Sequence, residues 1–158
     1  NGCLVKDCVT AGNSTNGIVV GENCRVINCT ANNNGGTGVN GIGITADIRT
    51  VIADCTADDN QNDGIKAAGD STLTNNHASH NGLGGAAAGI HTTGAGSRIG
   101  GNQVRDNNGT GILANSGDIV LRNAAGGNTT NYSPSSGANF APIQSPGSAT
   151  NPVANIVF

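Results

Sequence analysis

The sequence has almost no large side chains. Among its 158 residues there is no tryptophan and no methionine, and one tyrosine and two phenylalanines are its aromatic residues. An ordinary globular core uses such residues to fill its volume. This chain therefore needs an interior narrow enough for valine, isoleucine, alanine and threonine to fill, and its length indicates a single domain.

Charged residues are also scarce, with 7 basic and 10 acidic side chains and a net charge of −3. Without a basic surface, neither nucleic acid nor an anionic membrane is expected as a partner. No apolar run is long enough to cross a bilayer, and no signal peptide is present. Because the chain opens directly on NGCLVKDC, we expect that a leader or further upstream sequence has been removed.

The sequence is rich in asparagine and in glycine, of which it has 26, and one phrase returns along it at regular intervals. Each copy ends in an asparagine and carries a cysteine or a second asparagine five residues earlier. The spacing between successive Cys/Asn positions is 21, 26, 21, 26 and 21 residues. Apolar residues alternate within short segments, which predicts strands. A repeat of this length without helices predicts a solenoid.

The repeated asparagines have a structural explanation in such a solenoid. Equivalent residues of successive coils stack about 4.8 Å apart, so an inward asparagine can bond the amide above it and satisfy buried backbone groups at a bend. A cysteine at the same bend is a small apolar substitute. The predicted ladder positions are Cys8, Cys29, Cys55, Asn76, Asn102 and Asn123, and Asn13, Asn34, Asn60, Asn81, Asn107 and Asn128.

A Gly-Ile pair recurs between the copies, at 17–18, 41–42, 64–65, 89–90 and 111–112. The residue after each isoleucine is expected to point outward, and none of these residues is acidic: Val19, Gly43, Lys66, His91 and Leu113. The longer connections, GGTGVN and GLGGAAAG, predict loops that bulge from alternate coils.

These phrases resemble the repeats of the right-handed parallel β-helix family, the pectate-lyase-like superfamily, over residues 2–128. The resemblance implies an all-β fold, a right-handed single-stranded parallel β-helix of about six coils. We expect the coils at residues 1–128 and an irregular C-terminal capping segment at 129–158. That segment resembles the ending of uncharacterised secreted bacterial β-helix proteins, which implies a secreted or cell-surface location and no specific activity.

The C-terminal segment contains all three aromatic residues. We expect Tyr132, Phe140, Ile143 and Phe158 to cap the solenoid or to pack on a neighbouring subunit. The first residue already lies within a coil, and an open solenoid end exposes unpaired strand groups. One subunit could therefore cover the open end of the next, and such a head-to-tail contact would make a filament.

The five cysteines allow two interpretations. Stacked neighbours fall within the Cα separation of a disulfide, so Cys3–Cys24 and Cys8–Cys29 could bridge. Alternatively, the cysteines are buried free thiols that act as small hydrophobic side chains, which is the interpretation we favour. No C-x-x-C motif is present, and a zinc site is not expected.

One outward polar patch is a candidate active site. Asp59, His80 and Asp106 occupy equivalent positions just before the ladder asparagines, with Arg105 beside them, and such a stack could perform acid–base chemistry. Asp58, Asp59 and Asp63 are weak candidates for binding Ca²⁺. A solvated face of a solenoid also carries charges of this kind for solubility, and this explanation is favoured.

The sequence therefore favours a non-catalytic extracellular structural or adhesive solenoid, with the filament as its assembled form and no cofactor. The alternative is a carbohydrate-active enzyme, either a polysaccharide lyase or a glycoside hydrolase, or else a carbohydrate-binding module. In these cases a polysaccharide would be the partner.

Overall fold

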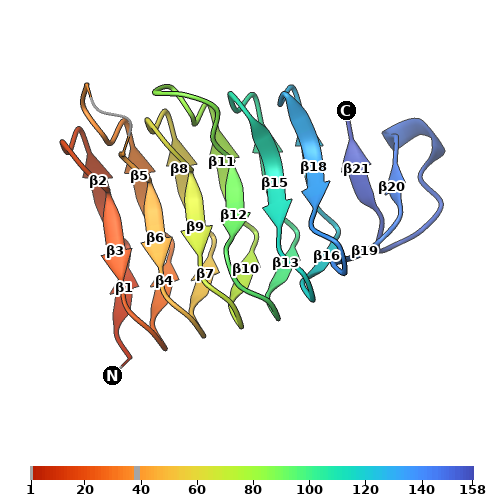
Figure 1. Cartoon of the computed structure of the whole chain (residues 1–158), viewed down its shortest axis with the longest axis horizontal. Coiled ribbons are helices and arrows are strands. Elements are labelled where there is room, and N and C mark those ends of the chain that lie inside the picture. The colour runs from red at the N-terminus through yellow and green to blue at the C-terminus, as the bar shows by residue number, and fades with distance from the viewer. Residues whose placement is uncertain (1, 38–39) are drawn as a thin grey trace.

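Three parallel β-sheets run side by side along the molecule, and the chain visits them in turn (Figure 1). The computed structural model describes residues 2–37 and 40–158. Every strand pairing in the described residues is parallel, and all but the pairing of the last two strands of one sheet join a strand to one in a neighbouring coil. This arrangement is a parallel β-helix, as the repeat predicted.

The strands of the three sheets follow one another along the helix axis. Sheet A contains β1 (Leu4–Lys6), β4 (Arg25–Ile27), β7 (Val51–Ala53), β10 (Thr72–Thr74), β13 (Arg98–Gly100), β16 (Ile119–Leu121) and β19 (Asn139–Phe140). Sheet B contains β2 (Val9–Ala11), β5 (Thr30–Asn32), β8 (Thr56–Asp58), β11 (His77–Ser79), β14 (Gln103–Arg105), β17 (Ala124–Gly126), β21 (Asn155–Val157) and β20 (Ile143–Gln144). Sheet C contains β3 (Ile18–Val20), β6 (Ile44–Ala46), β9 (Ile65–Ala67), β12 (Ile90–Thr92), β15 (Thr110–Ala114) and β18 (Thr130–Pro134).

The chain makes about seven coils rather than about six, because residues after Asn128 extend all three sheets. Strands β18, β19 and β21 pair in parallel with β15, β16 and β17. This part of the sequence does not contain the repeat phrase, so the additional coil could not be predicted from it. A short 3₁₀ helix, Pro146–Ser148, interrupts the last coil, and no helix of the described residues is long and apolar enough to span a membrane.

The interior is a stack of small and medium apolar side chains. Positions that share one place in the coil are fully buried, as at Ile52, Leu73 and Ile99 of sheet A. In sheet C the pair that stacks with Ile18 and Ile65 is Gly43–Ile44, not Gly41–Ile42 as predicted. The two candidate pairs lie two residues apart, so alternation alone could not distinguish them.

The chain turns sharply at three bends, from sheet A to B, from B to C and from C to A, and left-handed backbone residues occur at all three. Before the ladder residue at the bend from sheet A to sheet B, φ is between +51° and +58° at Asn28, Asp54, Asn75 and Arg122 and +71° at Gly101. Asparagine, aspartate and glycine tolerate this conformation best. The composition of the bends therefore follows from the backbone geometry.

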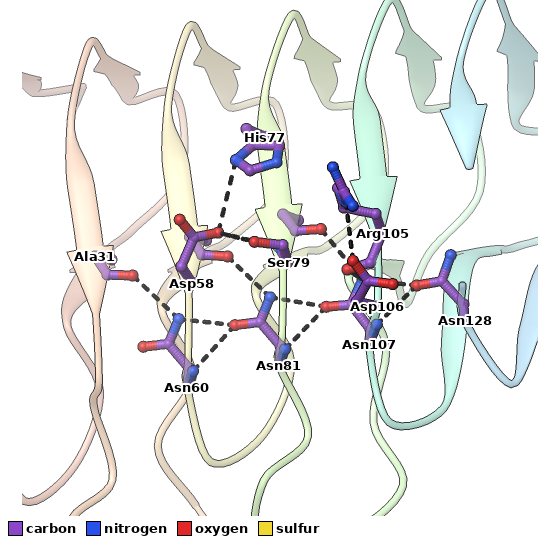
Figure 2. Close-up of polar contacts among 12 residues, drawn as sticks. Ala31, Asp58, Asn60, His77, Ser79, Asn81, Arg105, Asp106, Asn107 and Asn128 are labelled. Atoms are coloured by element: carbon purple, nitrogen blue, oxygen red, sulfur yellow. Dashed lines mark hydrogen bonds and ion pairs between the residues drawn. The ribbon is translucent and has the colours of Figure 1, made fainter. Parts of the chain in front are cut away.

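The ladder residues bond to one another from coil to coil (Figure 2). At the bend from sheet B to sheet C, the side-chain nitrogen of Asn60 donates to Asn81 and that of Asn81 donates to Asn107, both at 2.9 Å. The ladder between sheets A and B runs through Asn76, Asn102 and Asn123 and ends on Asn155, which was not predicted.

A third ladder, also not predicted, lies at the bend from sheet C to sheet A. Here the backbone N–H of Thr50 donates to the Ser71 hydroxyl, that of Ser71 to Ser97, and that of Ser97 to the fully buried Asp118. Among the described residues, no buried side-chain nitrogen or oxygen lacks a hydrogen-bond partner.

The four apolar residues expected to cap the solenoid behave differently. Tyr132 is buried opposite Ile112, and burial raises the pKa of its phenol. Its hydroxyl lies 2.9 Å from the backbone oxygens of Asn123 and Ile156, which belong to two successive coils and share its one hydrogen. Phe140 packs edge-on against Tyr132 with ring centroids 6.0 Å apart. Ile143 and Phe158 stay about half exposed.

We predict that Asn81→Ala lowers the free energy of unfolding by roughly 3 kcal/mol, because it leaves several buried polar groups without partners. Asn81 donates to Ala57 and Asn107 and accepts from Asn60. Urea unfolding followed by circular dichroism measures the change. The control is Gln103→Ala, an exposed amide in strand β14, and equal losses in the two variants would contradict the ladder's role.

Candidate functional site

The outward polar patch predicted from the sequence, called the acidic patch below, lies along the bend between sheets B and C. Asp59, His80 and Asp106 all have a left-handed backbone, with φ between +52° and +56°. The side chain of Arg105 donates to its neighbour Asp106 at 2.9 Å (Figure 2). His80 is exposed at its bend, so the geometry explains these residues as bend residues with solvated side chains.

The three candidate calcium ligands do not come together in the structure. Asp58 accepts a hydrogen bond from Ser79 at 2.7 Å and lies 3.7 Å from His77 (Figure 2). Asp63 points to a different face of the coil. Within residues 2–37 and 40–158, no group of three His, Cys, Asp or Glu side chains could hold a metal ion.

Asp63 instead forms a buried pair with His91 on the outer face of sheet C. One carboxylate oxygen lies 2.9 Å from His91 Nδ1, and the other accepts the backbone N–H of Ala88 at 2.7 Å. The Asp63 side chain is 7% exposed and the His91 side chain 24%. Because an ionised carboxylate can only accept, the hydrogen of this contact is on Nδ1, and in a neutral imidazole Nε2 is then the basic nitrogen.

A groove of about 320 Å³ lies over this pair. Lys66 and Leu113 flank His91 at the same outward position of the neighbouring strands, β9 and β15. Residues 86–88 form part of the opposite wall. The groove thus combines an acid–base pair, a positive charge and apolar surface, a composition typical of small-molecule sites.

The wall exists because of the glycine-rich insertion in this coil. Residues 82–88 extend from the bend and return to Asp63 through the Ala88 N–H. Gly109 lets them approach closely, since a Cβ there would lie 2.2 Å from the Ala87 oxygen. The loop that the sequence predicted is therefore what gives the groove its depth.

A second depression of about 260 Å³ continues from the first. Both are lined by Asn62, Ala86 and Ala87, and the second adds Asn40 and Gln61. Their amides offer donors and acceptors without charge. The two depressions share lining residues and draw on several successive coils, and together they are called the channel below.

Sequence reasoning missed this site. It placed Lys66, His91 and Leu113 correctly in one outward row, and it considered Asp63 separately as a calcium ligand. It did not predict the contact between them. Asp63 lies at a bend rather than in a strand, and its carboxylate reaches His91 in the next coil, 28 residues later in the sequence. The signal available in the sequence was that Asp63, Lys66 and His91, all titratable, lie within about one coil of each other.

The five cysteines are free in the structure. Cys24, Cys29 and Cys55 are buried, whereas Cys3 and Cys8 are exposed. Burial raises the pKa of the Cys55 thiol to about 11. The buried cysteines thus agree with the interpretation as small hydrophobic residues.

Comparison with known proteins identifies the class of this fold. The family model described as "Right handed beta helix region" matches residues 1–129, so the chain belongs to that family, and its coil is right-handed. No curated protein matches the sequence.

Two solved structures share the fold. Pectate lyase Pel9A is 20% identical, with a TM-score of 0.71 over 85% of this chain and 42% of that one. The A-module of the mannuronan C-5 epimerase AlgE4 from Azotobacter vinelandii is 15% identical, with a TM-score of 0.52 over 98% of this chain and 52% of that one. The chain thus spans about half the length of these structures. Its fold resembles that of these carbohydrate-active enzymes.

We predict that Gly109→Ala loosens the groove wall, because the added Cβ would collide with the Ala87 carbonyl. Amide exchange at Ala87 and Ala88 should then rise by roughly tenfold, the equivalent of about 1.4 kcal/mol of lost protection. Hydrogen exchange by NMR measures it. Gly147→Ala is the control, since a Cβ there meets nothing within 4 Å. Unchanged exchange in Gly109→Ala would show that the wall does not depend on this close approach.

Proposed function

We propose that this chain binds an acidic polysaccharide in the sheet C groove and transfers a proton on it through His91. The observation that carries the proposal is the Asp63–His91 pair, with a 2.9 Å contact, beside Lys66 in the channel. Asp63 orients the imidazole, as a carboxylate does for a histidine base. A secreted or cell-surface location goes with such a substrate and is part of the proposal.

The chemistry follows from the charges in the groove. Lys66 pairs with a sugar carboxylate and stabilises the negative charge that develops when the neighbouring carbon loses its proton. Nε2 of His91 takes that proton. The electron pair left on the carbon has two possible fates. It forms a C=C bond as the adjacent glycosidic carbon–oxygen bond breaks, and the departing oxygen takes the proton from Nε2 of His91. Alternatively, the carbon takes a proton from water on its other face, and Nε2 returns its proton to the solvent.

The similar structures support the choice of substrate. They are named for activity on pectate and on mannuronan, which are both polymers of uronic acids. The channel formed by the two depressions suits a chain of sugars better than a single one. The apolar side chains of Leu113 and Ala86–Ala88 offer a surface for the C–H face of a sugar ring.

We expect proton transfer on polygalacturonate or mannuronan. It is measured as ultraviolet absorbance of the new C=C bond beside the carboxylate if the chain is cleaved, or as deuterium uptake at that carbon in D₂O if the carbon is protonated again. His91→Gln and Asp63→Asn should each lower the rate by roughly 10²–10⁴-fold, the usual contribution of a general base. His77→Gln is the matched control, because His77 faces outward from sheet B beside Asp58.

Binding of either polymer with neither a new C=C bond nor deuterium uptake would contradict the catalytic part and favour a binding module. Equal loss of activity in His91→Gln and His77→Gln would place the chemistry outside the groove. If neither polymer binds, the predicted role as a non-catalytic structural protein becomes the better explanation.

A further inference from the structure

The sulfur atoms of Cys3 and Cys24 face each other across the first two coils, at a distance of 2.7 Å. The two residues directly precede the paired strands β1 and β4, and the backbone N–H of Arg25 donates to the Cys3 oxygen at 2.8 Å. They are therefore stacked in register. Stacked neighbours about 4.8 Å apart at Cα fall within the range that a disulfide spans.

The direction of these side chains follows from the third ladder. In that ladder, the backbone N–H of each residue donates to the side chain of its equivalent in the next coil, as Thr50 does to Ser71 at 3.1 Å. Cys3 and Cys24 begin the same row, and the Cys3 N–H lies 3.2 Å from the Cys24 sulfur. The Cys24 side chain consequently points along the axis toward the first coil.

The other stacked cysteines point elsewhere. The Cys8 thiol donates to the Lys6 carbonyl at 3.2 Å, that of Cys29 to Ile27 at 3.3 Å, and that of Cys55 to Ala53 at 3.1 Å. Each of these sulfurs contacts the backbone oxygen two residues earlier, as Cys24 also does with Glu22 at 3.5 Å. The thiols of Cys29 and Cys55 that reach the preceding coil meet a carbonyl there, at 3.7 and 3.5 Å, and not a sulfur. Stacking alone does not bring thiols together, and the described residues show a contact between sulfurs at Cys3 and Cys24.

We propose that Cys3 and Cys24 are a cross-linking site, at which a disulfide ties the first coil of the solenoid to the second. Formation requires an external disulfide as oxidant. The thiolate of one cysteine attacks it and releases one thiol, and the second cysteine then attacks the mixed disulfide and releases the other. Two cysteines are oxidised, the external disulfide is reduced to two thiols, and no other co-reactant is needed.

Exposure sets the order of the two steps. Cys3 is exposed, whereas Cys24 is 3% exposed, so Cys3 meets the oxidant and Cys24 resolves the mixed disulfide within the protein. The hydrogen bond between the two thiols raises the pKa of Cys3. Since the thiolate is the attacking species, the exchange is best performed at mildly alkaline pH.

The test is peptide mapping of the full chain after treatment with oxidised glutathione and blocking of the remaining thiols. Trypsin cleaves after Lys6 and Arg25, and a glutamate-specific protease cleaves after Glu22, so Cys3, Cys8 and Cys24 fall on three different peptides. We expect NGCLVK joined to NCR, with Cys8, Cys29 and Cys55 alkylated. A link to Cys8 or Cys29, a persistent glutathione adduct on Cys3, or five alkylated thiols would overturn the proposal.

Variants provide a second test that does not depend on mapping. Cys24→Ser should keep the fold, because serine occupies the same row at Ser71 and Ser97, and it should abolish the cross-link. Cys29→Ser should retain it. Oxidised wild-type protein should also lose thermal stability when a reductant is added, while Cys24→Ser should not respond, and an identical response of the two would contradict the link.

Discussion

The structure depends on one constraint, which is that every polar group turned inward has to be satisfied by the coil above or below it. The interior of the solenoid is narrow and filled mainly by small and medium apolar side chains, and an unpaired buried amide costs about 1–3 kcal/mol. Asparagine meets the constraint because it donates and accepts along the same axis, as Asn60, Asn81 and Asn107 do. The residue before each predicted ladder asparagine makes the sharp bend in a left-handed conformation, which is why asparagine, aspartate and glycine are frequent there.

The candidate site is formed by residues that are not needed to satisfy the polar groups inside the solenoid. Neither the glycine-rich loop at residues 82–88 nor the Asp63–His91 pair is needed to complete a coil. The loop returns to the solenoid through Asp63, whose second oxygen holds His91. One carboxylate therefore closes the groove wall and orients the imidazole. Lys66 then places a positive charge one coil away from that imidazole.

The fold could be predicted from the sequence because its signal is periodic. Asn76 and Asn102 recur at coil spacing, and their place in a ladder follows from stacking. The seventh coil was not predicted, because Tyr132 and Phe140 occupy inward positions that hold isoleucine and valine in earlier coils. The third ladder was missed because serine and aspartate took the place of asparagine.

The site could not be predicted in the same way. The contact between Asp63 and His91 joins a bend to a strand of the next coil. The two residues do not occupy equivalent positions of the repeat, and the connection between them includes the non-repeated loop at residues 82–88. The patch at Asp59, His80 and Asp106 was easier to find because it is periodic. Its periodicity reflects the backbone requirement of the bends, where these residues have φ near +55°.

The central claim is that the sheet C groove, rather than the charged bends, is the functional surface. NMR titration of ring-labelled histidines with a uronic-acid oligosaccharide tests this claim most directly, because the three histidines lie in three different settings. The account predicts that the ring nitrogens of His91 shift on binding while those of His77 and His80 do not. Shifts confined to His77 or His80 would contradict it and place the ligand on the acidic patch.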